Sequence, residues 1–142
     1  MWFRKIHLCV LIVLLLGTNV LALDQKDGVY QIATAEDLVG FSELVNGGEI
    51  IATAVLTADI DMAAESVNFL PIGTEVHMFS GVFDGQGHCI KNLNISLTQP
   101  RVGVFGVIQS PAVIKNFVLD ESCTIETTDN YAGIIGSAWG AN

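Results

Sequence analysis

Apolar positions along the chain change their spacing twice. Residues 8–16 form an almost unbroken apolar run. Residues 34–46 carry apolar side chains at helical spacing, which gives one apolar face made of Leu38, Phe41, Leu44 and Val45. From residue 50 onward the apolar residues fall in short runs separated by glycine and asparagine. The pattern predicts one helix in the body of the chain, followed by many short strands.

The expected helix has start and stop signals. Thr34 can accept a hydrogen bond from the backbone of the first turn, and Glu36 and Asp37 place negative charge at the positive end of the helix. Asn46-Gly47-Gly48 is expected to end it, because glycine adopts the left-handed conformation without strain.

The first 22 residues resemble an export signal. Arg4 and Lys5 precede the apolar run, and the small residues of Val20-Leu21-Ala22 suit a cleavage site. Residues 1–22 are therefore predicted to be a signal peptide, and 23–142 the mature chain. The alternative is an uncleaved membrane anchor, since the segment is nearly long enough to span a bilayer. After cleavage no membrane association is expected, and the protein is predicted to be secreted or on the cell surface.

Charge narrows the choice of partners. Without the leader, four basic residues remain against 15 acidic ones, so the net charge is 4 minus 15, or −11. An acidic surface repels phosphate backbones, which excludes nucleic acid as a partner. A glycan or a host or cell-surface protein remains possible.

Two short motifs recur in the second half of the chain. A glycine element begins at Gly81, Gly103 and Gly133, and an isoleucine element begins at Ile90 and Ile114. The offsets are 22 residues between the first two glycine elements, 30 between the next two, and 24 between the isoleucine elements. Units of 20 to 30 residues made of strands and turns predict a β-solenoid, in which matching side chains stack. The residues given this structural role are Gly81, Phe83, Ile90, Gly103, Phe105, Gly106, Ile114, Gly133, Ile135 and Gly136.

The helix is expected to cap the first coil. The last glycine element lacks an isoleucine element after it. The sequence is therefore expected to be the incomplete N-terminal part of a longer repeat protein.

The glycine elements resemble a known repeat. Gly-Val-Phe-Gly at 103–106 and Gly-Ile-Ile-Gly at 133–136 are similar to the GLUG motif of large bacterial surface proteins, including some immunoglobulin-A-cleaving metallopeptidases. The segment 79–88 is similar to the stretch that leads into such repeats. The resemblance implies an all-β, right-handed parallel β-helix with a short N-terminal capping α-helix, displayed at the cell surface and often adhesin-like. The catalytic zinc domain of those peptidases has no counterpart here.

Candidate chemistry is sparse. Asp59 and Asp61 flank Ile60, so in a strand both carboxylates face outward and are weak candidates for calcium, although solvated carboxylates explain them equally well. The segment Asp84 to His88 could be a metal or catalytic corner, but a tight turn is the preferred interpretation. Lys91-Asn92 and Lys115-Asn116 are expected to stack as an asparagine ladder, with the lysines in solvent.

The two cysteines of the mature chain leave alternatives open. Cys89 and Cys123 could form one disulfide in an oxidising compartment, or fill buried positions on neighbouring strands.

No catalytic motif and no cofactor site is expected from the sequence. The sequence predicts a non-enzymatic scaffold or adhesin-like binding module. One alternative is the N-terminal part of a β-helix carbohydrate-active enzyme, or of a larger peptidase, whose catalytic residues lie beyond Asn142. Another is a stalk that holds a distal domain away from the cell.

Overall fold

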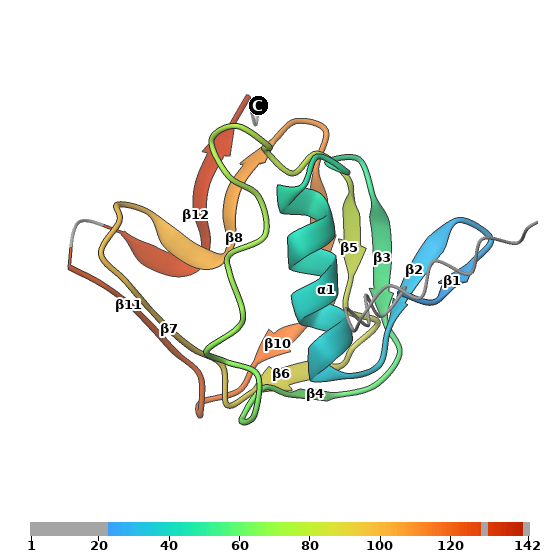
Figure 1. Cartoon of the computed structure of the whole chain (residues 1–142), viewed down its shortest axis with the longest axis horizontal. Coiled ribbons are helices and arrows are strands. Elements are labelled where there is room, and N and C mark those ends of the chain that lie inside the picture. The colour runs from blue at the N-terminus through green and yellow to red at the C-terminus, as the bar shows by residue number, and fades with distance from the viewer. Residues whose placement is uncertain (1–22, 129–130, 141–142) are drawn as a thin grey trace, which may run out of the picture.

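The protein consists mostly of short strands with one helix (Figure 1). The computed structural model describes residues 23–128 and 131–140. The expected signal peptide, residues 1–22, lies outside the described residues. In chain order the elements are β1 (Gln25–Lys26), β2 (Val29–Ile32), α1 (Ala35–Asn46), β3 (Thr53–Leu56), β4 (Ile60–Asp61), β5 (Val82–Asp84), β6 (Cys89–Lys91), β7 (Asn94–Leu97), β8 (Val102–Gln109), β9 (Val113–Lys115), β10 (Val118–Leu119), β11 (Thr124–Thr127) and β12 (Ala132–Trp139).

The helix begins where the sequence predicts. Thr34 is the N-cap, and its hydroxyl accepts a hydrogen bond from the Asp37 backbone N–H at 3.1 Å. The Asp37 carboxylate accepts in return from the Thr34 backbone N–H at 3.0 Å, which completes a capping box. The end differs from the expectation, since Gly47 has right-handed helical dihedrals and Gly48 is the glycine with positive φ.

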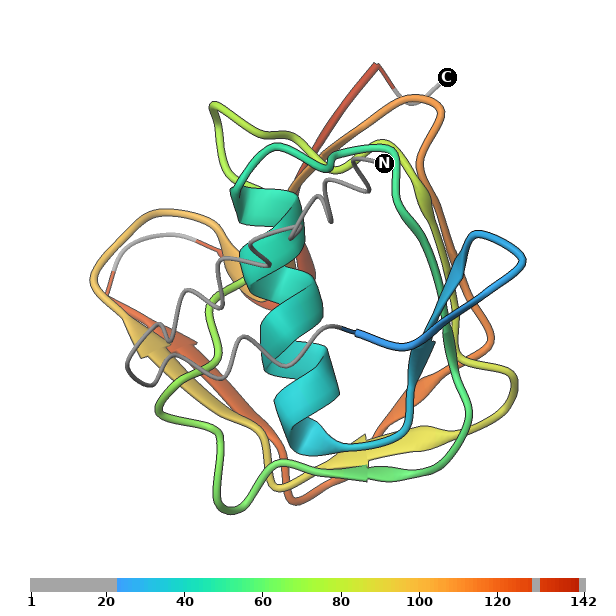
Figure 2. The ribbon, with the colours of Figure 1, turned by 45° about the vertical axis from the view of Figure 1, so that its right-hand side comes forward.

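Most strands pair in parallel across a long sequence separation. The largest sheet has the order β1-β2-β3-β5-β9, and all its pairs are parallel except β1 with β2. Three smaller sheets have the orders β10-β6-β4, β11-β7 and β12-β8, also in parallel. Parallel neighbours need a long connection between them. Here that connection runs through the other sheets (Figure 2).

The register corrects the predicted repeat for the isoleucine elements. Ile90 pairs with Ile60 on one side and with Leu119 on the other, whereas Ile114 pairs with Phe83. Ile60 and Ile90 are thirty residues apart, not 24. The prediction failed because two similar isoleucine motifs lie in different sheets, β6 and β9.

The glycine elements divide in the same way. Gly103 lies opposite Gly133, and Phe105 lies opposite Ile135, again thirty residues apart. The first element is not their equivalent, because Phe83 pairs with Ala54 and Ile114. Gly81 has a separate reason to be glycine: a Cβ there would lie 2.0 Å from the Ala52 carbonyl oxygen. The 22-residue offset is therefore wrong as a structural register.

The core is a cluster of aromatic rings that joins strands distant in sequence. The Phe83 ring lies 5.2 Å from that of Phe105 and 5.6 Å from that of Phe117, both edge to face. Phe41 of the helix lies 6.0 Å from Phe83 and 6.1 Å from Phe79. Edge-to-face contacts of this kind add to the stabilisation from apolar burial. The helix is therefore part of the core.

The helix is also fastened to the chain before β5. The Asn46 side chain donates to the Pro71 carbonyl oxygen at 3.0 Å and accepts from the Gly73 backbone N–H at 2.9 Å. Ile72 then forms a parallel bridge to Phe105 in β8. In space the order is therefore α1, the segment 71–73, β8 and β12. No helix among the described residues is long and apolar enough to cross a membrane.

Candidate functional site: two polar corners

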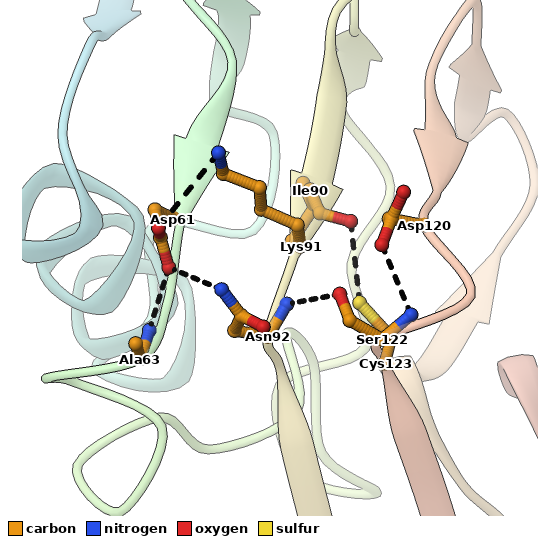
Figure 3. Close-up of polar contacts among 8 residues, drawn as sticks. All are labelled: Asp61, Ala63, Ile90, Lys91, Asn92, Asp120, Ser122 and Cys123. Carbon is orange, nitrogen blue, oxygen red and sulfur yellow. Dashed lines mark hydrogen bonds and ion pairs between the residues drawn. The ribbon is translucent and has the colours of Figure 1, made fainter.

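A polar corner is formed where β4 ends (Figure 3). The Asp61 Oδ1 atom accepts hydrogen bonds from the Ala63 backbone N–H at 3.1 Å and from the Asn92 side-chain amide at 2.8 Å. Lys91, the register partner of Asp61, places its Nζ 3.8 Å from Asp61 Oδ2. These residues (Asp61, Lys91 and Asn92) are named the Asp61 corner. The donors, with the Asn92 amide contributing most, lower the pKa of Asp61 below its ordinary value.

The same arrangement occurs where β5 ends. The Asp84 Oδ1 atom accepts from the Gln86 backbone N–H at 2.9 Å and from the Asn116 side-chain amide at 3.1 Å. Lys115, the register partner of Asp84, lies 3.5 Å from Asp84 Oδ2. Asp84, Lys115 and Asn116 are named the Asp84 corner. Its pKa is also lowered, chiefly by the Gln86 backbone hydrogen bond.

Backbone geometry explains why asparagine stands at both corners. Asn92 has φ of 56° and Asn116 has φ of 57°, in the left-handed region. Asparagine tolerates this conformation better than most residues and carries an amide that can reach the carboxylate. The predicted asparagine ladder is wrong: the two residues follow strands of different sheets and each bonds to a carboxylate. The lysines are about half exposed, yet each pairs with an aspartate.

Two serines extend the Asp61 corner, and the sequence analysis missed them. The Ser122 hydroxyl accepts from the Asn92 backbone N–H at 2.9 Å, and the Ser66 hydroxyl donates to the Asn92 carbonyl oxygen at 2.8 Å. Asp120 accepts from the Ser122 backbone N–H at 3.0 Å (Figure 3), the third turn in which an aspartate binds the N–H two residues on. The Asp-x-Ser spacing at 120–122 signals this turn.

Asp59 and Asp61, the weak metal candidates, have different partners. The Asp59 Oδ1 atom accepts from the Cys89 backbone N–H at 3.0 Å and from His88 Nδ1–H at 3.2 Å. The Cys89 hydrogen bond is the main reason that the pKa of Asp59 is lowered. Within the described ranges no three His, Cys, Asp or Glu side chains gather into a group that could hold a metal ion.

The segment from Asp84 to His88 is a turn. The Asp84 carboxylate binds the Gln86 backbone, and Gln86 and Gly87 have φ of 50° and 85°. Gly85 is required for space, because a Cβ there would lie 2.1 Å from that of Phe117. This corrects the expectation that both glycines take positive φ.

The cysteines are not bridged. Cys89 and Cys123 are free thiols, and the Cys123 thiol donates to the Ile90 carbonyl oxygen at 3.2 Å. Partial burial, with Asp59 and Asp120 nearby, raises the pKa of the Cys89 thiol. A raised pKa leaves less thiolate at neutral pH, so Cys89 is a poor nucleophile.

The corners have no geometry for catalysis. Each carboxylate accepts at least two hydrogen bonds, and its asparagine and lysine partners come from a strand about thirty residues further along the chain. Their donors hold the aspartates in the ionised form, which suits neither a general acid nor a general base near neutral pH. The corners can therefore tie neighbouring strands together and present a patterned polar surface.

Comparisons with known proteins give one similarity. The chain is 33% identical over 91 residues to halomucin from Haloquadratum walsbyi, a match that covers 56% of this chain. The chain spans about 1% of the length of halomucin. No family model matches the chain, and no solved structure does.

Proposed function

We propose that the protein is an exported, non-enzymatic scaffold or adhesin-like module whose strands are wound as a right-handed parallel β-helix. In this architecture each layer is one circuit of the chain, and the polar corners tie one layer to the next. The repetition of the same aspartate, lysine and asparagine contacts at two corners is the observation that carries the proposal. A repeated contact of this kind suits a structure that extends by stacking.

Three further observations support the architecture. Parallel partners lie about thirty residues apart in several sheets, as in Ile60 with Ile90 and Gly103 with Gly133. The helix occupies the position of a strand in the first layer, next to the segment 71–73. The resemblance of the glycine elements to GLUG repeats points the same way.

Export is supported by the leader-like pattern of residues 1–22 and by the similarity to halomucin, whose name describes a mucin. The partner proposed is a glycan or a cell-surface protein. The acidic surface favours neutral or basic partners and disfavours nucleic acid.

The binding role is tested with the chain secreted by an expression host. The protein is applied to an array of neutral, acidic and basic glycans, and its adhesion to cells is measured when it is displayed on beads. Saturable binding to a neutral or basic ligand supports the adhesin-like role. Absence of binding to glycans and cells would leave a pure scaffold and remove the adhesin-like version.

The competing function is an enzyme, and the same preparation tests it. Polysaccharides incubated with the protein are assayed for new reducing ends and for unsaturated products of a lyase. We expect neither. Turnover that survives purification and disappears on heat unfolding would overturn the non-enzymatic assignment.

A further inference from the structure

Three strands in the C-terminal part of the chain lie at the edges of their sheets. β9, β10 and β12 each pair with one earlier strand only, within the described residues. β12 is the longest of them, with eight residues. The outer edge of such a strand presents backbone groups that can pair with another strand.

The same strands expose apolar side chains. In β12, Ile135 is 40% exposed, although its register partner Phe105 in β8 is fully buried. Trp139 is 53% exposed and Tyr131, which precedes β12, is 67% exposed. The others in this group are Val113, Val118 and Ile134. We name these six residues and the outer edge of β12 the open face.

A glycine in β12 has room for another backbone. A Cβ on Gly103 in β8 would lie 2.7 Å from the Gly133 carbonyl oxygen, so the close approach of β12 requires glycine there. Gly133 occupies the same register in β12, but the nearest atom to its Cβ position is 3.9 Å away. A further strand could therefore approach β12 as closely as β12 approaches β8.

The opposite end is covered. β1 pairs antiparallel with β2, and α1 is fastened to the segment 71–73 by Asn46. A second copy therefore cannot add its open face to this end, which excludes head-to-tail assembly through these two surfaces. Open face against open face is the remaining arrangement, and it gives a closed, twofold contact.

We propose that the open face is the docking surface for a second copy of this chain, in a twofold dimer with edge strands β12 adjacent and antiparallel. The inference rests on the layered architecture proposed above. The six exposed apolar residues leave on the order of 600 Å² of surface per copy, against about 800 Å² per partner in a standard interface. The area fits a reversible dimer of moderate affinity.

Charge opposes this contact. Each mature copy carries a net charge of −11, from four basic and 15 acidic residues. Added salt screens this repulsion. Dimerisation is therefore expected to strengthen as the salt concentration rises, whereas an interface held by ion pairs would weaken.

Analytical ultracentrifugation of the secreted, purified chain tests the proposal over a wide range of protein concentrations and at low and high salt. The expected result is a monomer–dimer equilibrium that shifts to dimer with salt. A monomer at every concentration would overturn the proposal, and so would growth into species larger than a dimer.

Variants locate the contact. Ile135→Glu and Gly133→Val should each weaken the dimer about tenfold or more, with an unchanged circular dichroism spectrum, because both side chains are on the open face. Val67→Glu is the matched control, since Val67 is 91% exposed outside this face. Equal weakening by the control, or no effect of Gly133→Val on a folded chain, contradicts the assignment.

The dimer and the layered fold can fail separately. A monomer that retains nuclear Overhauser contacts between Phe83 and Ile114 removes the dimer alone. Loss of those contacts in the wild-type chain removes the layered architecture and the dimer with it.

Discussion

The side-chain amide of Asn92 donates a hydrogen bond to the Asp61 carboxylate at 2.8 Å, and this contact joins two neighbouring parallel strands at their ends. Asn116 makes the same contact with Asp84 at 3.1 Å in another sheet. In both cases a lysine precedes the asparagine and approaches the same aspartate. We interpret the corners as ties between layers, and several consequences can be measured.

Replacement of Asn92 separates the backbone effect from the amide effect. Asn92→Ala should destabilise the protein more than Asn92→Gly, by about 1 kcal/mol, because alanine is strained at a φ of 56° and glycine is not. Both variants should be less stable than the wild type, since both lose the amide. Urea unfolding followed by circular dichroism measures the difference. Equal stabilities of the two variants would show that the left-handed conformation is not populated.

The corner carboxylates predict sensitivity to acid. The pKa values of Asp61 and Asp84 are lowered in the folded state from their ordinary value of 3.8, so their contribution is present above that pH. It is lost as the pH falls through the lower, folded-state pKa values. The free energy of unfolding should therefore be nearly flat from neutral pH to about pH 5 and decline below pH 4.

A variant assigns this decline to the corner. Asp84→Asn should be less stable than the wild type at neutral pH and should lose less stability on acidification. Glu75→Gln, at an exposed position outside both corners, serves as the control. A decline in Asp84→Asn as steep as in the wild type would mean that other carboxylates govern acid unfolding.

Two register-paired glycines should respond oppositely to alanine. Gly103→Ala places a methyl group 2.7 Å from the Gly133 carbonyl oxygen and should destabilise the protein by about 1–3 kcal/mol. Gly133→Ala meets nothing closer than 3.9 Å and should leave the melting temperature of the monomer almost unchanged or slightly raised. Thermal unfolding at low protein concentration compares them. A larger loss for Gly133→Ala would contradict the placement of β12.

The free cysteines predict indifference to reductant. Because Cys89 and Cys123 are not bridged, the melting temperature of the secreted chain should be the same with and without dithiothreitol. Thiol titration after unfolding should find both cysteines reactive. A lower melting temperature under reducing conditions, with no thiols titrated before reduction, would indicate a disulfide instead.

The helix and the strand-rich body could be predicted because their signals are local. Thr34 and Asp37 form the capping box that their spacing indicates, and alternation in short runs marks the strands. The register could not be predicted in the same way. It depends on the lengths of turns between strands, which place Ile90 beside Leu119 rather than Ile114.

The candidate site was visible only in part. The repeated Lys-Asn pairs are plain in the sequence, and both lie at corners. Their aspartate partners stand about thirty residues earlier, and nothing local links Asp61 to Asn92. Contacts between sequence-distant side chains follow from register, so the polar corners became visible only with the strand pairing.

The central claim is that parallel strands about thirty residues apart lie side by side. Nuclear Overhauser spectroscopy of the isotope-labelled, secreted chain tests it most directly. The account predicts contacts between Phe83 and Ile114, between Ile95 and Ile125, and between Phe105 and Ile135. Contacts between Ile90 and Ile114, with none between Ile90 and Leu119, would contradict it.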